Sequence, residues 1–258
     1  MLKSKLYERT LYLNKEIDYL FNCEIREYDL KSAGLNLIKY FKLLPQDKID
    51  YLSKMDKVER NKEIGMLQKN KDFAKVLKDA FTEARRMFFD ANNIEDYEVL
   101  SVKKDAIFII RKLCFNNTFG DLEFRVKNQY LGYMHLNNKE FYYTDPETPL
   151  DVKGFGADVE YYHGEYMLDF IRDVFTNAIY CSRLDTIREL TKFVSAYRHK
   201  YLDYGYYRML DEEMYYDVID DGERFKVKDV ESDDVNIDIT YNYFKYIIPI
   251  ACIFIDWQ

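Results

Sequence analysis

The sequence predicts an α+β fold in which an antiparallel sheet backed by helices is followed by a mixed, largely helical region. Strand-like apolar runs occur at 23–29, 97–102 and 106–110, with helical spacing between the first two, and helical spacing returns at 165–201. Gly (9) and Pro (4) are scarce among the 258 residues, so long flexible linkers are not expected. Strands grouped apart from helices in this way are typical of α+β domains.

The first two elements follow from the spacing of the apolar side chains. Residues 3–21 place leucines and an isoleucine among charged residues at helical intervals, which predicts an amphipathic helix. Residues 23–29 alternate and are rich in β-favouring side chains, which predicts a strand that ends at Asp29. The chain therefore presents an acidic side chain where its first strand stops.

Helices are expected between the first strand and the next one. Ser32 is a suitable N-cap for a helix that runs to Leu44, because Pro45 cannot continue it. Residues 71–90 form the clearest helix, with apolar residues at steps of three, one and three. Two shorter helical segments between them are predicted at 47–53 and 56–70.

A β-hairpin is predicted after these helices. Residues 97–102 and 106–110 are strand-like, and Lys103-Lys104-Asp105 forms the corner between them. The hairpin therefore carries an acid at its tip. The remaining expected elements are strands at 121–127, 129–136 and 139–143, helices over 165–201, and an aromatic, acidic tail from 202.

Charge divides the chain into two halves. Residues 1–128 hold 25 Lys and Arg against 21 Asp and Glu, a net charge of +4, whereas residues 129–258 hold 13 against 25, a net charge of -12. We expect two regions with different roles, divided at this point. Because the whole chain has a net charge of -8, it would bind a phosphate backbone only where positive charge is concentrated.

Neither a zinc site nor a membrane span is expected. The four cysteines are widely spaced, without a CxxC pair or a Cys/His cluster, and their apolar surroundings predict buried, reduced thiols. The most apolar run, 246–255, covers about half a bilayer crossing and contains a proline, so it is predicted to be buried structure. The first residues are charged and amphipathic, unlike a signal peptide, and we expect a cytoplasmic location.

Asp29 and Asp105 are the candidate catalytic residues. If their strands lie side by side, both carboxylates meet at one edge of the sheet. Nucleotidyl transfer with two divalent ions about 4 Å apart requires such a pair of acids. Magnesium prefers oxygen ligands and keeps several waters, so two protein carboxylates can suffice. These residue types therefore permit a site for two Mg²⁺ ions at Asp29 and Asp105, and the alternative is that the two acids are turn or cap residues, as most acids at strand ends are.

Three segments resemble, in the right order, the polymerase motifs of the family B DNA polymerases. Residues 29–36 keep the Asp and Ser of the first motif, Asp-x-x-Ser-Leu-Tyr-Pro-Ser. Residues 57–65 keep the Lys, Asn and Gly of the second motif, Lys-x-x-x-Asn-Ser-x-Tyr-Gly. Residues 103–109 keep the second Asp of the third motif, Asp-Thr-Asp-Ser with apolar flanks. The resemblance implies a polymerase palm with short, fingers-like helices in the first half of the chain and a thumb-like region in the second.

The resemblance also implies roles for the matched residues. Asp29 and Asp105 would hold the metal ions, assisted by the carbonyl of Leu30. Lys57 would contact the incoming triphosphate, where a cation stabilises developing charge. Asn61 would help to shape the nucleotide pocket.

Two downstream segments extend the resemblance over 23–156. Residues 138–141 are similar to the family's Lys-Lys-Arg-Tyr element, which holds the primer-template, and residues 151–154 resemble the Lys-Gly element that follows it. Lys139 and Lys153 would therefore touch the nucleic-acid backbone.

Departures from the family pattern bear on function. The first Asp of the third motif is Lys103 here, so one carboxylate is lost and a cation lies near the expected metals. The first-motif Tyr, which blocks the ribose 2′-hydroxyl, falls on Gly34, so ribonucleotides should fit. The second-motif Tyr falls on Ile64. Only 28 residues precede Asp29, so no exonuclease domain is expected before the palm.

Three functions are compatible with the sequence. The first is a minimal template-directed nucleotidyltransferase, ribonucleotide-tolerant or primase-like, that acts on nucleic acid and nucleoside triphosphates. The second is a palm-derived protein without catalysis that binds nucleic acid or assembles with other polymerase or replication subunits, and is encoded by a virus or phage. The third is an interaction protein that uses its many aromatic residues, 25 Tyr and 18 Phe, to stack on bases or pack against a partner.

Overall fold

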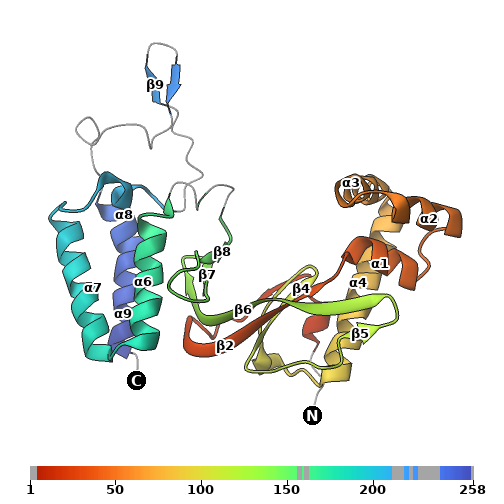
Figure 1. The fold of residues 1–258 in the computed structure, drawn as a ribbon, viewed down its shortest axis with the longest axis horizontal. Helices are drawn as coiled ribbons and strands as arrows, with labels where there is room; N and C mark the ends of the chain where they lie inside the picture. The colour runs from red at the N-terminus through yellow and green to blue at the C-terminus, as the bar shows by residue number, and fades with distance from the viewer. Residues whose placement is uncertain are drawn as a thin grey trace. The chain divides into compact units, whose positions relative to one another are not determined.

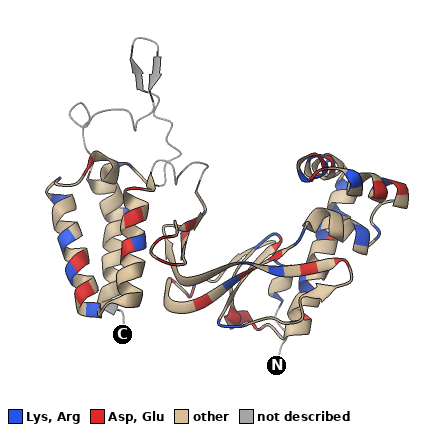
Figure 2. Ribbon diagram, in the orientation of Figure 1, with Lys and Arg blue, Asp and Glu red and all other residues tan. Residues whose placement is uncertain are grey.

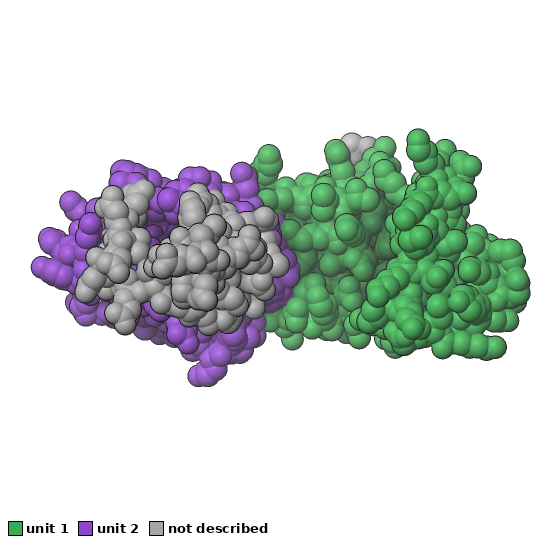
Figure 3. All heavy atoms as spheres, turned by 90° about the horizontal axis from the view of Figure 1, so that it is seen from above, with its two compact units in different colours: residues 1–16, 24–129 green, residues 17–23, 130–258 purple. Residues whose placement is uncertain are grey.

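The chain forms two compact units in the computed structural model, which are coloured separately in Figure 3. One unit comprises residues 1–16 and 24–129, and the other comprises residues 17–23 and 130–258. The structure describes residues 5–155, 159, 163–210, 218–220, 223–225 and 239–256.

An antiparallel sheet of eight strands is the central element, in the order β1-β3-β4-β2-β6-β7-β8, with β5 paired to β6 (Figure 1). Neighbouring strands are paired in antiparallel register at β1–β3, β3–β4, β2–β4, β5–β6, β6–β7 and β7–β8. The α+β prediction with an antiparallel sheet is therefore confirmed. The strands are β1 Leu11–Leu13, β2 Tyr19–Leu30, β3 Val99–Lys103, β4 Ala106–Ile110, β5 Thr118–Phe119, β6 Leu122–Leu136, β7 Lys139–Tyr143 and β8 Asp151–Lys153.

Helices cover one face of the sheet in the first unit. Tyr28 of β2 and Phe124 of β6 lie in contact with Phe88 of the longest helix, with ring centroids 5.2 Å and 4.5 Å from it. All three side chains are fully buried, so this aromatic contact anchors the helix to the strands. The helices are α1 Ala33–Tyr40, α2 Gln46–Lys54, α3 Lys57–Leu67 and α4 Lys71–Asn92, with 3-10 turns η1 Leu6–Glu8 and η2 Asp96–Glu98.

Several predicted boundaries are wrong in this unit. One helix was expected over 3–21, but the described part, 5–21, forms η1, β1 and the start of β2. Tyr12 of β1 pairs with Val102, and this ladder outweighs the local helical spacing. The first helix stops at Tyr40, not at Leu44, since Lys42 takes a left-handed conformation (φ 50°). The two strands expected at 121–127 and 129–136 are the single strand β6.

Three helices and the strand β7 form the core of the second unit. Phe175 of α6 stacks on Tyr143 of β7 with ring centroids 5.3 Å apart, and both are fully buried. Figure 2 shows charged residues of both signs along α7 and none along most of α9, which agrees with the burial of Ile250. The elements are α6 Met167–Tyr180, α7 Arg183–Arg198, η3 Tyr204–Tyr207, β9 Val218–Asp220, β10 Glu223–Phe225, α8 Thr240–Asn242, the π-helical turn η6 Tyr243–Ile247 and α9 Ile248–Asp256.

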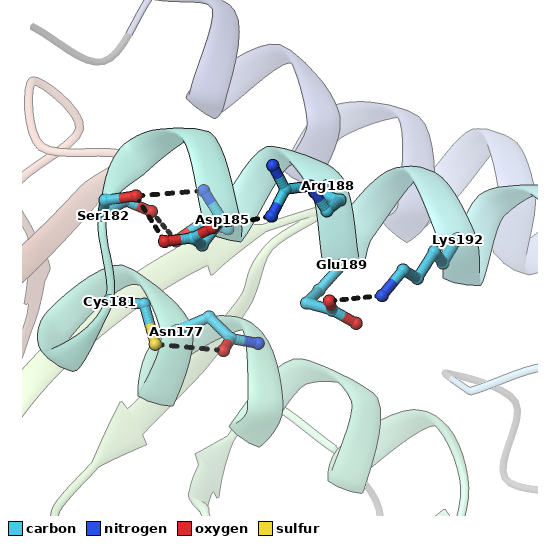
Figure 4. A network of polar contacts seen from close by, with 8 residues as sticks. Asn177, Cys181, Ser182, Asp185, Arg188, Glu189 and Lys192 are labelled. Carbon is cyan, nitrogen blue, oxygen red and sulfur yellow. Dashed lines mark hydrogen bonds and ion pairs between the residues drawn. The ribbon is translucent and has the colours of Figure 1, made fainter.

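A sharp corner separates α6 from α7 (Figure 4). Ser182 caps α7, because its hydroxyl accepts a hydrogen bond from the N–H of Asp185 (3.2 Å) and donates one to the carboxylate of the same residue (2.7 Å). Arg188 then donates to Asp185 (3.0 Å), and Lys192 to Glu189 (2.6 Å). The helical prediction over 165–201 is therefore correct, with a break at this capped corner.

The expectation of buried thiols holds for only half of the cysteines. Cys23 and Cys114 are buried, whereas Cys181 and Cys252 are exposed because they lie at the end of α6 and on the outer side of α9. No helix in the described ranges is long and apolar enough to cross a membrane.

Replacement of Gly132 by Ala is expected to destabilise the second unit. A Cβ atom at this position in β6 would lie 2.7 Å from Cδ1 of Phe175, whose ring is held by Tyr143. We expect Gly132→Ala to lower the free energy of unfolding by about 1–3 kcal/mol in urea titrations. The control Gly65→Ala, in α3 with no neighbouring atom within 4 Å, should instead raise it by about 0.5–1 kcal/mol. Equal effects of both substitutions would contradict the packing argument.

Candidate functional site

Asp29 and Asp105 lie at the same edge of the sheet, on adjacent strands. In the β2–β4 ladder Asp29 is opposite Ala106, the residue after Asp105. The N–H of Leu30 donates to the backbone carbonyl of Asp105 at 3.2 Å, which ties the end of β2 to the hairpin tip. The structure therefore brings together the two acids that the sequence places 76 positions apart.

The hairpin tip is fixed by contacts from two other segments. Lys104 adopts a left-handed conformation (φ 55°), and its N–H donates to the carbonyl of Thr10 at 2.8 Å. Its own carbonyl accepts a hydrogen bond from Arg85 of α4 at 2.7 Å. Asp105 is therefore presented by a turn that the backbone of the amino-terminal segment and a helical arginine hold in place.

Arg85 is a buried charge that no sequence motif marks. Its side chain is 1% exposed and also donates to the carbonyl of Tyr7 at 2.8 Å. Burial lowers the pKa of Arg85 to about 10, and the negative charge of Asp105 partly offsets this effect. The signal in the sequence was an arginine on the apolar face of the helix, one turn from Phe81 and from Phe88.

Asp29 lies in an environment that disfavours its charge. Burial raises the pKa of Asp29 above its ordinary value, and the charge of Asp105 raises it further, whereas Lys127 and Arg125 act in the opposite direction. The guanidinium of Arg125 is 3.7 Å from the carboxylate of Asp29, and its side chain is 52% exposed. The acid is thus incompletely neutralised by this pair.

A cavity of about 910 Å³ opens where β2, the hairpin tip, α1, α3 and α4 converge. It lies entirely within the first unit. The structure places six of the eight predicted site residues in its lining, and they are Asp29, Leu30, Gly34, Lys57, Asn61 and Asp105.

The α3 side of the cavity carries the segment that resembles the second motif. Asp56 caps this helix by accepting hydrogen bonds from the N–H groups of Val58 (2.8 Å) and Glu59 (3.1 Å). Lys57 and Asn61 are four residues apart, so they lie on one face of α3, and both line the cavity.

Gly34 packs directly against α3. A Cβ atom at Gly34 would lie 3.2 Å from Cδ1 of Ile64, which is 4% exposed. The side chain of Ile64 therefore occupies the space beside the glycine. Ile64 and Gly34 both line the cavity, and Ile64 forms its wall beside the glycine.

Lys139 and Lys153 do not line this cavity. They belong to β7 and β8 of the second unit. The ammonium of Lys139 donates to the carbonyl of Gly154 at 2.5 Å and lies 4.8 Å from the ring centroid of Phe155, while Lys153 pairs with Asp151. Their contact with nucleic acid stays a prediction.

Positive charge is concentrated around the two acids. The cavity lining contains eight Lys and Arg residues against two Asp, although the chain as a whole is acidic. Of these cations only Lys57 stands at a position that a motif specifies. Lys31, Arg60 and Lys104 lie within the matched segments at other positions, and the remaining four come from segments that meet the motifs only in the fold. The eight are Lys31, Lys57, Arg60, Lys78, Arg85, Lys104, Arg125 and Lys127.

The donor set suits a hard cation. The acidic side chains in the lining, Asp29 and Asp105, offer oxygen atoms, which magnesium prefers, and Leu30 also lines the cavity. In the part of the chain that the structure describes, no group of three or more His, Cys, Asp and Glu could hold a metal ion. A magnesium ion at this place would therefore rely on water and substrate oxygens for its remaining ligands.

Asp29→Asn is expected to stabilise the folded protein in the absence of metal. Because the pKa of Asp29 is raised on folding, the folded state binds its proton more tightly, and stability is lost as pH rises through the folded pKa. The difference in unfolding free energy between variant and wild type should therefore grow from acidic to neutral pH. The measurement is urea denaturation in EDTA across this range.

The matched control is Asp79→Asn, which changes an exposed acid on α4. It should show no such growth with pH. A variant at Asp29 that becomes relatively less stable as pH rises would contradict the sign of the pKa shift.

Comparison with known protein families identifies one whose model matches nearly the whole chain. The model of one family, described as bacteriophage PBS1 gene 130 protein, matches residues 1–256. A search of curated proteins found no match. The expected viral or phage origin agrees with the family match. The chain belongs to the bacteriophage PBS1 gene 130 protein family.

Proposed function

We propose that this protein is a minimal template-directed nucleotidyltransferase whose first unit acts as a polymerase palm. One observation carries the proposal: Asp29 and Asp105 meet at the end of adjacent antiparallel strands, in a cavity that also includes Lys57 and Asn61. These four residues come from the three segments that resemble the family B polymerase motifs. The substrates are a nucleic-acid template or primer and nucleoside triphosphates.

In this mechanism the two acids hold divalent cations and the helix α3 holds the nucleotide. Two bound Mg²⁺ ions would lower the pKa of the attacking 3′-hydroxyl and neutralise charge on the leaving group. Asp29 and Asp105, with the carbonyl of Leu30, would hold them. Lys57 would stabilise the charge that develops on the phosphates, and Asn61 would orient the nucleotide. With this activity the protein would act in the cytoplasm of the infected cell, where its substrates occur, alongside other replication subunits.

A second candidate function is favoured by the cation close to Asp29. The guanidinium of Arg125 is 3.7 Å from this carboxylate, and Lys103 replaces the other acid of the third motif. A palm that has lost metal binding would keep the basic cavity and serve as a nucleic-acid-binding or polymerase-assembly subunit. Binding of nucleic acid that is unaffected by magnesium, without nucleotide incorporation, distinguishes this function from the first.

Removal of either acid is expected to abolish synthesis. Asp29→Ala and Asp105→Ala should each reduce magnesium-dependent nucleotide incorporation by at least about a hundredfold, because each removes a metal ligand. The assay follows extension of a primed template, and de novo synthesis on an unprimed one. Asp121→Ala, an exposed acid between β5 and β6, is the control and should retain activity. Wild-type protein that is inert with every template and nucleotide would contradict the proposal.

Sugar selectivity should depend on Ile64. Because Gly34 carries no side chain, we expect ribonucleotides and deoxyribonucleotides to be incorporated with similar kcat/KM. Ile64→Phe adds bulk at the only side chain that fills the space beside Gly34 within the described residues, and should reduce kcat/KM for ribonucleotides more than for deoxyribonucleotides. Equal loss for both sugars would show that Ile64 does not approach the ribose.

A further inference from the structure

We propose that the α3–α4 side of the cavity is a polyphosphate-binding site in which Lys57, Arg60 and Lys78 hold the anion without a metal ion. The proposal rests on the nucleotidyl-transfer function above for its natural ligand, a nucleoside triphosphate. Arg60 and Lys78 match no motif, and α4 contains none of the segments that resemble the family B polymerases.

The cations of the cavity differ in how far they are neutralised. Three are paired with acids, and the pairs are Lys31–Glu123 (2.9 Å), Lys127–Glu27 (3.1 Å) and Arg125–Asp29 (3.7 Å). Arg85 donates hydrogen bonds to the backbone carbonyls of Tyr7 and Lys104. By contrast, no ion pair within the described residues involves Lys57, Arg60 or Lys78. Lys104, at the hairpin tip, likewise has none there.

The helical cations are arranged for a compact anion. Lys57 and Arg60 are three residues apart on α3, so their Cβ atoms are about 5–6 Å apart, and Lys78 adds a third charge from α4. Positive charges gathered in one partly enclosed cavity repel each other until an anion joins them. A polyphosphate carries several negative charges within a short length, whereas a nucleic-acid strand distributes one charge per nucleotide along its length.

The two acids explain why the anion needs these cations. Asp29 and Asp105 line the same cavity and repel a phosphate chain that enters it. Lys57, Arg60 and Lys78, which make no ion pair within the described ranges, supply the attraction that the cations paired with acids cannot. A nucleotide held by its phosphates on the helices is then enclosed in the same volume as the carboxylates.

Titration of the full chain with inorganic tripolyphosphate tests the site directly. The measurement is isothermal calorimetry in EDTA at low ionic strength. Arg60→Gln and Lys78→Gln should each weaken binding by about tenfold, the loss expected for one charge-assisted hydrogen bond. The controls are Lys62→Gln and Lys75→Gln, which remove the same charge from exposed positions of the same helices outside the cavity. Each control should change the Kd by less than about twofold.

Three results would overturn the proposal. They are the absence of tripolyphosphate binding by the wild type, equal weakening by cavity and control variants, and displacement of tripolyphosphate by a single-stranded oligonucleotide that lacks a terminal triphosphate. The last result would identify a nucleic-acid surface instead.

Asp29→Ala separates this site from the proposed reaction. It should bind tripolyphosphate at least as tightly as the wild type, since it removes a negative charge, while incorporation is lost. If the wild-type protein binds tripolyphosphate but incorporates no nucleotide, the proposed reaction is wrong and the proposed binding site stands. If Arg60→Gln and Lys78→Gln incorporate nucleotides with an unchanged KM, the proposed binding site is wrong and the proposed reaction stands.

Discussion

The pairing of β2 with β4 is the interaction on which the site depends. Five register pairs run from Ile25–Ile110 to Asp29–Ala106, and a slip of one residue would turn every side chain of β2 to the other face. Tyr28 opposes such a slip, because it is fully buried against Phe88 and its hydroxyl accepts a hydrogen bond from the N–H of Cys114 at 2.8 Å. The same register that buries Tyr28 places Asp29 at the cavity.

The site is built from groups that do not favour folding by themselves. A half-buried acid next to a second acid and a fully buried arginine both cost free energy in the folded state, because burial disfavours their charged forms. The aromatic core offsets this cost. Eleven of the twelve largest fully buried side chains that the structure describes are Tyr or Phe, so the aromatic richness of the chain is used mainly in packing. Functional sites commonly combine such local instability with a strong scaffold around them.

Local patterns in the sequence were sufficient for the existence of the strand that contains Asp29, although β2 begins at Tyr19 and ends at Leu30, for the hairpin tip at Asp105 and for the helix α4. They failed where a distant partner decides the structure, as at residues 5–21, where pairing of β1 with β3 replaces the expected helix. The concentration of positive charge around the cavity could not be predicted from the sequence for the same reason. Arg60 and Lys78 are ordinary surface-like residues in the sequence, and only the convergence of α3 and α4 gives them a common environment. Motif spacing identifies residues that share one element, whereas a site made by several elements appears only in three dimensions.

The two units are formed from interleaved segments of the chain. Residues 17–23 belong to one unit, while the segments before and after them belong to the other. In the second unit, Phe21 lies against Phe175 and Phe254, with ring centroids 5.8 Å and 5.7 Å away. A chain divided after residue 129 would therefore leave the second unit without residues 17–23 and their part of its core. The chain cannot be divided at one point between the units so that both keep their complete cores.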